Sequence, residues 1–216
     1  MTSLLTTKFK ALTIGLAALV AAPAIMMGAA STTEASAPAA VGASAPDFTL
    51  MDLDGKAHTL SEYTKEGNVV VLEWYSPTCP FVRKHYRDDT GTMTKMESDL
   101  QGKNVVWLRI NSAHAEHPSA DMKLNKDTAA DWNITSPILM DPTGKVGKSY
   151  GAKRTPEMYI ITSDQTLVYH GAIDNRSDAA APGDDNYVSN ALEEVLAGES
   201  VTKSKSKAYG CSVKYN

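Results

Sequence analysis

The chain has 216 residues, of which 21 are lysine or arginine and 25 are aspartate or glutamate, so its formal net charge is −4 at pH 7. An acidic chain without a basic stripe, and without aromatic residues placed between basic ones, argues against a nucleic-acid partner. Two cysteines occur in the sequence, Cys79 and Cys211. An account of the thiol chemistry therefore has to explain both of them together.

The first thirty residues have the pattern of a secretory signal peptide. Lys8 and Lys10 precede an uncharged run over residues 11–30 that ends in small residues. This pattern predicts cleavage before Ser31 and export to a periplasm or secretion from the cell. An uncleaved membrane anchor is the alternative, because about twenty uncharged residues just span a bilayer. Cleavage removes two lysines and no acids, so the formal charge becomes −4 − 2 = −6.

The rest of the sequence divides into three parts. Residues 31–45 are small and polar, as in a flexible linker. Residues 46–200 are long enough for one domain with one sizeable core. Residues 201–216 form a tail that is rich in lysine and serine and carries Cys211. In an oxidising compartment outside the cytoplasm, the two cysteines can form a disulfide.

Hydrophobic periodicity and turn residues predict an alternation of strands and helices. The predicted strands cover residues 48–53, 58–60, 69–74, 105–110, 138–140, 158–162 and 167–170. The predicted helices are a short one capped by Ser61 and further segments at 80–100, 118–132, 146–150 and 187–196. This order predicts an α/β fold in which helices flank a central mixed β-sheet, with an N-terminal β-hairpin. Right-handed crossovers place strand ends and helix starts at one rim of the sheet, where Cys79 lies.

Cys79 is the first candidate nucleophile. It lies in the stretch YSPTCPFV, directly after the apolar run VVVLEW and before a predicted helix. At a helix start the thiol faces unpaired N–H groups and the positive end of the helix dipole, which lower its pKa and favour the reactive thiolate. Pro77 and Pro80 bracket a polar loop, which favours this interpretation over a buried, inert cysteine. Val82 stands where a C-x-x-C motif has its second cysteine, so no disulfide can form within the motif.

Two further features belong to the same rim. Glu73 is the charged residue of an otherwise apolar strand; buried there, its pKa rises and it can pass a proton to or from the Cys79 sulfur. A glutamate that points into solvent at the strand end is the alternative. Pro156 is permitted only at the start of a central strand. A cis Thr155–Pro156 bond would bend the chain toward Cys79 and leave a backbone edge free for a peptide, whereas a trans proline in a loop is the alternative.

These motifs resemble those of the thioredoxin-like superfamily. The strand VVVLEW, the loop YSPTCP, the Thr-Pro before MYIIT and the hairpin with YHGAID are similar to exported redoxins of the AhpC/TSA peroxiredoxin and TlpA types, over about residues 45–196. The resemblance implies a thioredoxin-like fold and a cis Thr155–Pro156 bond that lies against the active-site cysteine. It also implies an acidic residue six positions before that cysteine, which is Glu73. Pro77, Thr155 and Pro156 are the candidate substrate contacts.

The chain also departs from both types. Thioredoxins and TlpA proteins have a second cysteine at the position of Val82. Peroxiredoxins have Pro seven residues, and Thr or Ser three residues, before the cysteine that attacks peroxide. Ser76 fits the second of these positions, but Leu72 occupies the first. Peroxiredoxins also use an arginine near the sulfur, for which Arg83 and Arg154 are the candidates.

The end of the chain suggests a partner for Cys79. The CPFV-x-K-H-Y run that begins at Cys79, and the Gly-Cys-Ser-x-Lys ending at Gly210–Lys214, resemble a further branch of peroxiredoxin-like proteins. A sulfenic acid formed on Cys79 has to be resolved by another thiol, and Cys211 is the other thiol in the sequence. Three alternatives stay open: a permanent structural disulfide, a lone exposed thiol, and a cysteine that meets another molecule.

The remaining polar residues near these motifs are weaker candidates. Lys84 and His85 follow the cysteine, where cations either hold a thiolate or an incoming anion or form a solvated face; we expect the solvated face for Lys84. His114 and His117 have a spacing that occurs in metal sites. Because no third ligand is evident, the sequence predicts no metal, and it predicts no other cofactor.

Two classes of function follow from these residues. In the first, an enzyme, the Cys79 thiolate attacks a peroxide or a protein disulfide, Cys211 resolves the adduct, and an external thiol reductant resets the pair. Ser76 favours a peroxide substrate, whereas Glu73 and the Thr-Pro loop favour protein disulfides. In the second, the protein is a non-catalytic binding module in which Cys79 and Cys211 form a structural disulfide. A membrane is a partner only if the signal segment stays uncleaved.

Overall fold

A computed structural model describes residues 2, 38–87 and 91–216. The predicted signal peptide, residues 1–30, lies outside the described residues apart from Thr2, as does the predicted linker up to residue 37. In the described part of the chain, none of the helices has the length and apolar character needed to cross a bilayer.

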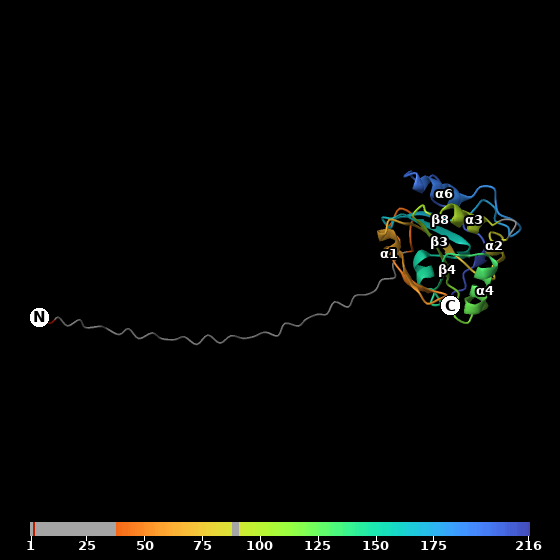
Figure 1. Cartoon of the computed structure of the whole chain (residues 1–216), viewed down its shortest axis with the longest axis horizontal. Helices are drawn as coiled ribbons and strands as arrows, with labels where there is room; N and C mark the ends of the chain where they lie inside the picture. Colours follow the sequence, from red (N-terminus) through yellow and green to blue (C-terminus); the bar gives the residue numbers. More distant parts are fainter. Residues whose placement is uncertain (1, 3–37, 88–90) are drawn as a thin grey trace. The chain divides into compact units, whose positions relative to one another are not determined.

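The domain is an α/β fold built on a mixed sheet of seven strands in the order β2-β1-β5-β4-β3-β7-β8 (Figure 1). Its strands are β1 (Thr49–Asp52), β2 (Ala57–Thr59), β3 (Val69–Trp74), β4 (Val105–Asn111), β5 (Ile138–Met140), β7 (Glu157–Ile161) and β8 (Leu167–Gly171). The helices are α1 (Leu60–Lys65), α2 (Pro80–Arg83), α3 (Thr92–Asp99), the 3-10 turn η1 (Pro118–Ala120), α4 (Met122–Asp131), α5 (Lys145–Tyr150) and α6 (Tyr187–Leu196). A separate pair of short strands consists of β6 (Arg154–Thr155) and β9 (Cys211–Ser212). The predicted α/β architecture with a central mixed sheet is confirmed.

The strand β3 lies inside the sheet, between β4 and β7, as expected for a strand that is apolar on both faces apart from Glu73. It runs parallel to β4 and antiparallel to β7. Val70, Leu72 and Trp74 belong to the core on the side of α1 and α5. Val71 and the following Tyr75 belong to the core on the other side, where α2, α3 and α6 pack; Figure 1 shows α3 and α6 together there. The loop after β3 therefore starts at the rim of the sheet, between two packed layers.

The segment predicted as one helix over 80–100 forms two helices, so this prediction is wrong. α2 ends at Arg83, and α3 begins after Gly91, whose φ of +46° lies in the left-handed region that favours glycine. The break has a tertiary cause. Lys84 and His85 turn inward directly after α2 and are 1% and 0% exposed.

Two helix starts also differ from the predictions. The segment predicted as a helix over 118–132 begins with a 3-10 turn, and α4 is then capped by the Asp121 carboxylate, which accepts a hydrogen bond from the Leu124 N–H at 2.7 Å. Ser61 is the second residue of α1 and not its cap. Its N–H donates to Asp47 Oδ1 at 2.9 Å. In both places a carboxylate satisfies an N–H group that has no partner within the helix.

The last part of the predicted linker is attached to the domain, which corrects the prediction for these residues. Ala39, Gly42 and Ala45 donate backbone hydrogen bonds to the carbonyls of Ser149, Leu167 and Gln165. Ala45 itself is buried in the core. Because the backbone of 39–45 is paired in this way, the domain begins before residue 46.

The tail is attached along its length as well. It first contacts α6, where the Thr202 N–H donates to Glu194 Oε2 at 2.9 Å. It then contacts β8, where the His170 N–H donates to the Ser204 carbonyl at 3.1 Å and the Ser206 N–H donates to the His170 carbonyl at 3.2 Å. Its last contact is at Tyr215, whose hydroxyl donates to the Ala152 carbonyl at 2.9 Å. Between the contacts with β8 and this last one, the tail contributes β9 to the pair with β6.

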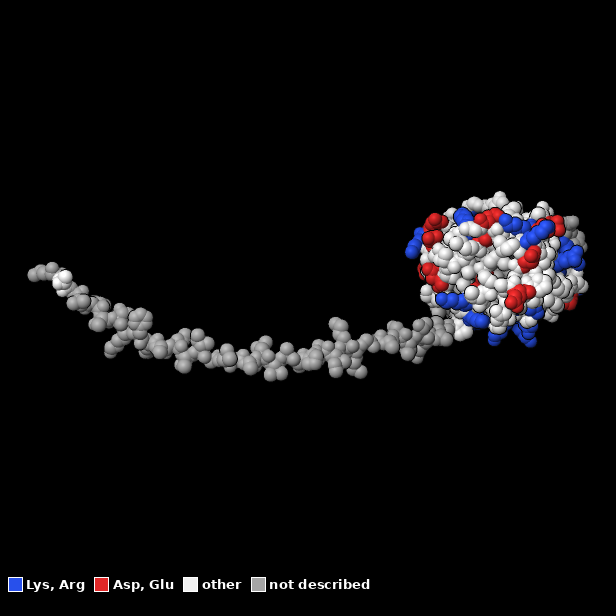
Figure 2. Space-filling model, turned by 90° about the horizontal axis from the view of Figure 1, so that it is seen from below, with Lys and Arg blue, Asp and Glu red and all other residues white. Residues whose placement is uncertain are grey.

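Charged side chains are spread over the surface. On the face seen in Figure 2, lysine and arginine side chains are interspersed with aspartate and glutamate side chains. That face therefore carries no large area of a single sign of charge.

Candidate active site

Cys79 lies at the N-terminal boundary of α2 and is 2% exposed. Its Sγ donates a hydrogen bond to the carbonyl oxygen of Thr155 at 3.0 Å. It makes no hydrogen bond to the free N–H groups of α2, which has only four residues. The expected contact with these N–H groups is therefore replaced by a contact with the loop that precedes Pro156.

The Thr155–Pro156 peptide bond is cis, as the resemblance implied. The backbone edge beside it is not free, which corrects the prediction of an open edge for a peptide. β6 pairs antiparallel with β9, and Thr155 stands opposite Cys211 in the register. The chain's own tail therefore occupies this edge.

Cys211 is brought to Cys79 by this strand pairing. Both cysteines are free thiols. Burial raises the pKa of Cys211 to about 11, together with a hydrogen bond to Cys79 and the charge of Cys79, while Lys214 and Arg154 act in the opposite direction. Cys211 therefore stays a protonated thiol near neutral pH.

A cleft of about 230 Å³ opens beside the two thiols. Its lining is formed by the segment after β3, by the end of β4 and the segment after it, by Thr155 of β6 and by the tail: Tyr75, Ser76, Thr78, Cys79, Asn111, Ser112, Ala113, His117, Ser119, Thr155, Cys211, Ser212, Val213 and Lys214. The cleft is small, and it admits a small oxidant more readily than a folded partner.

The predicted site residues are divided between the cleft and its surroundings. Ser76 lies in the cleft, with its Oγ 3.2 Å from Thr78 Oγ1. Pro77 and Pro156 are buried and stand next to lining residues without lining the cleft themselves. Arg154 is exposed, and its Nη1 donates to the Gly210 carbonyl at 3.4 Å.

The arginine expected near the sulfur does not reach the cleft. Arg83 and Arg154 are both exposed, and neither is among the described residues that line the cleft. Arg154 lies against the tail instead, where it contacts the residue before Cys211. The positive charge at the cleft comes from Lys214, which the sequence analysis did not single out for this purpose.

Glu73 is fully buried, so the alternative of a solvent-facing glutamate is wrong. Its Oε2 accepts hydrogen bonds from the Tyr86 hydroxyl at 2.6 Å and from Trp107 Nε1 at 3.1 Å, and it lies 3.4 Å from Arg109 Nε. Burial raises the pKa of Glu73 against the opposing effects of Arg109 and of these two hydrogen bonds. Among the described residues, no hydrogen bond joins Glu73 to either cysteine, so its role in proton transfer stays a prediction.

His117 lines the cleft, whereas the metal interpretation of His114 and His117 finds no further ligand. His117 Nδ1 accepts a hydrogen bond from the Ser119 N–H at 3.1 Å. Burial lowers the pKa of His117, and the nearby His114 and Lys214 add to this effect. Over residues 38–87 and 91–216, no three histidine, cysteine or carboxylate side chains are grouped as a metal site requires.

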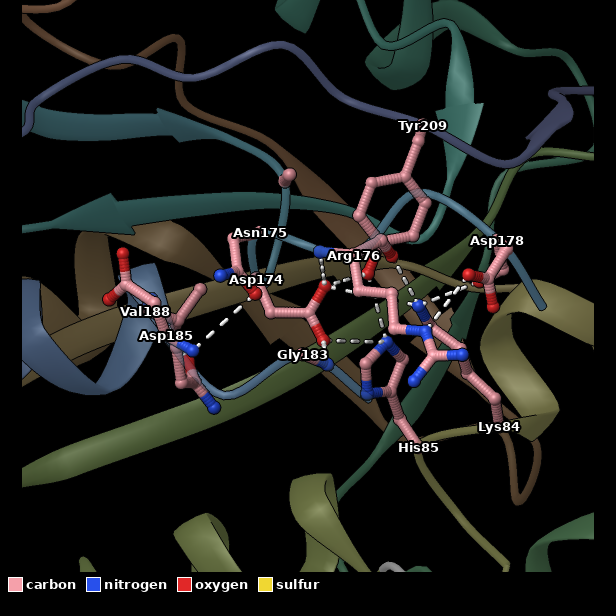
Figure 3. Close-up of polar contacts among 12 residues, drawn as sticks. Lys84, His85, Asp174, Asn175, Arg176, Asp178, Gly183, Asp185, Val188 and Tyr209 are labelled. Atoms are coloured by element: carbon pink, nitrogen blue, oxygen red, sulfur yellow. Dashed lines mark hydrogen bonds and ion pairs between the residues drawn. The ribbon is translucent and has the colours of Figure 1, made fainter. Parts of the chain in front are cut away.

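A buried polar cluster next to this site was missed by the sequence analysis. It consists of Lys84, His85, Asp174 and Tyr209. Figure 3 shows the His85 and Tyr209 side chains pointing toward the Asp174 carboxylate. Lys84 is 1% exposed, so the expected solvated face is wrong. The sequence carried one signal of this cluster, the acidic residue directly after the apolar end of the YHGAID motif.

The fold and the paired thiols define a redoxin with a thioredoxin-like fold. The AhpC/TSA family matches residues 41–170, more than half of the chain. The chain therefore belongs to the AhpC/TSA family.

Three similar proteins illustrate this relationship. The thiol-disulfide oxidoreductase ResA of Geobacillus thermodenitrificans is 31% identical over 123 residues, which cover 56% of this chain and 63% of ResA, less than two thirds of that protein. A Mycobacterium tuberculosis protein that carries the name of a peroxiredoxin is 31% identical over 122 residues, covering 55% of this chain and 68% of that one. The crystal structure of a hypothetical protein from Sinorhizobium meliloti is 27% identical, with a TM-score of 0.74 over 82% of this chain and 95% of that one.

Proposed function

We propose that this chain is a thiol peroxidase with two reacting cysteines, Cys79 as the nucleophile and Cys211 as the resolving thiol. The observation that carries the proposal is the pairing of β9 with β6. It sets Cys211 opposite Thr155, and the carbonyl of the same Thr155 accepts the hydrogen bond from Cys79. The family match and the peroxiredoxin name of the M. tuberculosis relative support peroxide as the oxidant.

The proposed reaction has three steps. The Cys79 thiolate attacks one oxygen of the peroxide, the O–O bond breaks, and the leaving alkoxide or hydroxide takes a proton, so that Cys79 is oxidised to a sulfenic acid. The Cys211 sulfur then attacks the sulfenic sulfur; the S–S bond forms, and the hydroxyl group leaves as water with the Cys211 proton. An external thiol reductant, either a thioredoxin-like protein or a small thiol, reduces the disulfide by exchange.

The access to Cys79 favours a small oxidant over a protein disulfide. Cys79 is 2% exposed, and the backbone edge at Thr155, along which an extended peptide would have to pair, is occupied by β9. A peroxide needs only the cleft beside the thiol. A protein disulfide needs the tail to leave first.

Thiol-disulfide exchange is the second candidate, because two observations favour it. The ResA relative carries that activity in its name, and the buried Glu73 has the raised pKa that a proton-transfer group needs. In this reaction the Cys79 thiolate attacks a small disulfide, one thiol of that disulfide leaves, and Cys211 then displaces the other.

Peroxide titration of the reduced protein, residues 31–216, tests the proposal. Stoichiometric hydrogen peroxide is expected to convert the two thiols into one Cys79–Cys211 disulfide, with a loss of two hydrogens in the intact mass. Cys79→Ser should abolish the reaction. Cys211→Ser should stop it at the sulfenic acid. Reaction with a small disulfide and not with peroxide would replace the first candidate by the second. A Cys79–Cys211 disulfide that resists mild reductants would instead identify a structural disulfide in a binding module.

Export stays part of the proposal, since it rests on residues 1–30. The expected outcome in a bacterial host is a mature chain that begins at Ser31 outside the cytoplasm. Detection of the uncleaved chain in the membrane fraction would contradict it and would make the segment an anchor.

A further inference from the structure

The tail that carries Cys211 is anchored two residues before this cysteine, where Tyr209 donates a hydrogen bond to the buried carboxylate of Asp174. Asp174 is 2% exposed. Its Oδ1 accepts hydrogen bonds from the Tyr209 hydroxyl at 2.5 Å and from the Arg176 N–H at 3.0 Å, and its Oδ2 accepts one from the Gly183 N–H at 2.5 Å (Figure 3). A buried carboxylate with several donors is held firmly in place.

The other side of this anchor belongs to the segment that begins at Cys79. His85 Nε2 lies 3.1 Å from the Tyr209 hydroxyl, and Lys84 Nζ lies 4.4 Å from the centre of the Tyr209 ring. The Phe81 ring also packs at 6.3 Å from it. Tyr209 therefore ties the tail both to the loop after β8 and to the residues that follow the nucleophile.

The hydrogen atoms in this cluster have a definite arrangement. Burial, followed by the hydrogen bond to Asp174, raises the pKa of Tyr209, so its hydroxyl keeps its proton and donates it to Asp174. Burial lowers the pKa of His85 to about 4, so the ring is neutral at pH 7. Its Nδ1 has no hydrogen-bond partner among the described residues, which places the proton on Nε2, where it is donated to the Tyr209 oxygen.

Between the anchor and the thiol stands a single glycine. Gly210 has a φ of +113°, and a Cβ there would lie 2.1 Å from the Thr155 carbonyl oxygen. This is the oxygen that accepts the hydrogen bond from Cys79. Three consecutive residues thus act together: Tyr209 anchors the tail, Gly210 lets its backbone approach Thr155, and Cys211 carries the thiol.

We propose that Tyr209 is a positioning residue for the resolving step: its hydrogen bond to Asp174 holds the tail so that Cys211 reaches the sulfenic acid on Cys79. This inference rests on the proposed function. Tyr209 takes no part in the attack on peroxide, because its hydroxyl is bonded to Asp174 and His85 and is not among the described residues that line the cleft. Loss of the Tyr209 hydroxyl therefore affects only the fate of the sulfenic acid on Cys79. Resolution by Cys211 competes there with oxidation by a second peroxide, which adds one oxygen to give a sulfinic acid and releases water or an alcohol.

The test is Tyr209→Phe, which keeps the ring against Phe81 and Lys84 and removes the hydroxyl. Stopped-flow measurements should give a rate of Cys79 oxidation by hydrogen peroxide equal to that of the unmodified chain. The following rate of disulfide formation should fall about tenfold or more, as expected for the loss of a hydrogen bond to a carboxylate. Trapping of the sulfenic acid with dimedone and the yield of sulfinic acid should both rise. Asp174→Asn should change the same two quantities in the same direction.

A matched control exists in α1, beside the N-terminal hairpin. The Tyr63 hydroxyl lies 2.5 Å from His58 Nδ1, and His58 Nε2 lies 2.8 Å from Asp52 Oδ2. Tyr63→Phe therefore removes a hydroxyl from a second group of tyrosine, histidine and aspartate, in which the histidine stands between the other two. It should leave the rate of disulfide formation unchanged. An unchanged rate in Tyr209→Phe, or equal slowing in both variants, would overturn the inference. Failure of the unmodified protein to react with peroxide would instead overturn the proposed function.

Discussion

The substitution Gly210→Ala tests the close approach of the tail to the cis-proline loop. The new Cβ would lie 2.1 Å from the Thr155 oxygen and 2.9 Å from the Thr155 carbonyl carbon, both backbone atoms. Since non-bonded heavy atoms settle at about 3.5 Å, β9 has to move by roughly 1 Å. The φ of +113° adds a backbone cost of about 1–3 kcal/mol for a residue with a side chain. This range corresponds to a loss of roughly 5- to 150-fold in the population of the attached tail.

The assay is the rate of Cys79–Cys211 disulfide formation after peroxide addition, read by intact mass, together with the reactivity of Cys79 toward a bulky thiol reagent. In Gly210→Ala the disulfide should form more slowly and Cys79 should become more reactive toward the reagent. Gly198→Ala is the matched control. Gly198 also has a positive φ, +75°, but no atom lies within 4 Å of a Cβ there. An unchanged disulfide rate in Gly210→Ala would refute the reasoning, because the tail would then tolerate a side chain at its narrowest point.

Two further predictions concern buried charge. The pKa of His85 is about 4 in the folded protein and about 6.5 in the unfolded chain, so only the unfolded chain gains a proton between these pH values. The free energy of unfolding should therefore fall by up to about 3 kcal/mol as the pH drops from 6.5 to 4. Urea unfolding of the protein and of His85→Gln checks this, and an equal pH slope in both would contradict it. Glu73→Gln removes the carboxylate from the buried ion pair of Glu73 with Arg109, while Arg109 keeps its second partner, Glu97, at 2.7 Å. The substitution should lower the free energy of unfolding by about 3 kcal/mol. Asp99→Asn, in the exposed pair with Lys95, should cost less than about 1 kcal/mol; similar losses in the two variants would show that burial is not the cause.

The regular elements of the fold were predicted well where local sequence decides them. The bounds of β3, β5 and α6 agree with the prediction, because continuous apolar runs and a strong amphipathic pattern are properties of the segments themselves. The break between α2 and α3 was not predicted, because Lys84 and His85 are drawn inward by Asp174. That residue lies some ninety positions away and is brought near only by the completed sheet.

The sequence predicted which thiols form the candidate site, but it did not predict which residues surround them. Two cysteines in the whole chain suggested a pair, and the structure brings Cys79 and Cys211 together through Thr155. Arg154 was a candidate because peroxiredoxins use an arginine near the sulfur, but strand pairing turns it outward against the tail. The contribution of Tyr209 had no signal in the sequence, since a tyrosine in a polar tail is indistinguishable from an exposed one until its partners are placed.

The pairing of β6 with β9 has a consequence for how these molecules behave when they are crowded. Whenever β9 leaves, the edge of β6 exposes unpaired N–H and C=O groups, and such an edge accepts a strand from any chain of matching sequence. At high concentration that strand is the tail of a neighbouring molecule. Two chains would then exchange tails reciprocally, and peroxide would fix the exchange as a dimer linked by two disulfides, each joining Cys79 of one chain to Cys211 of the other.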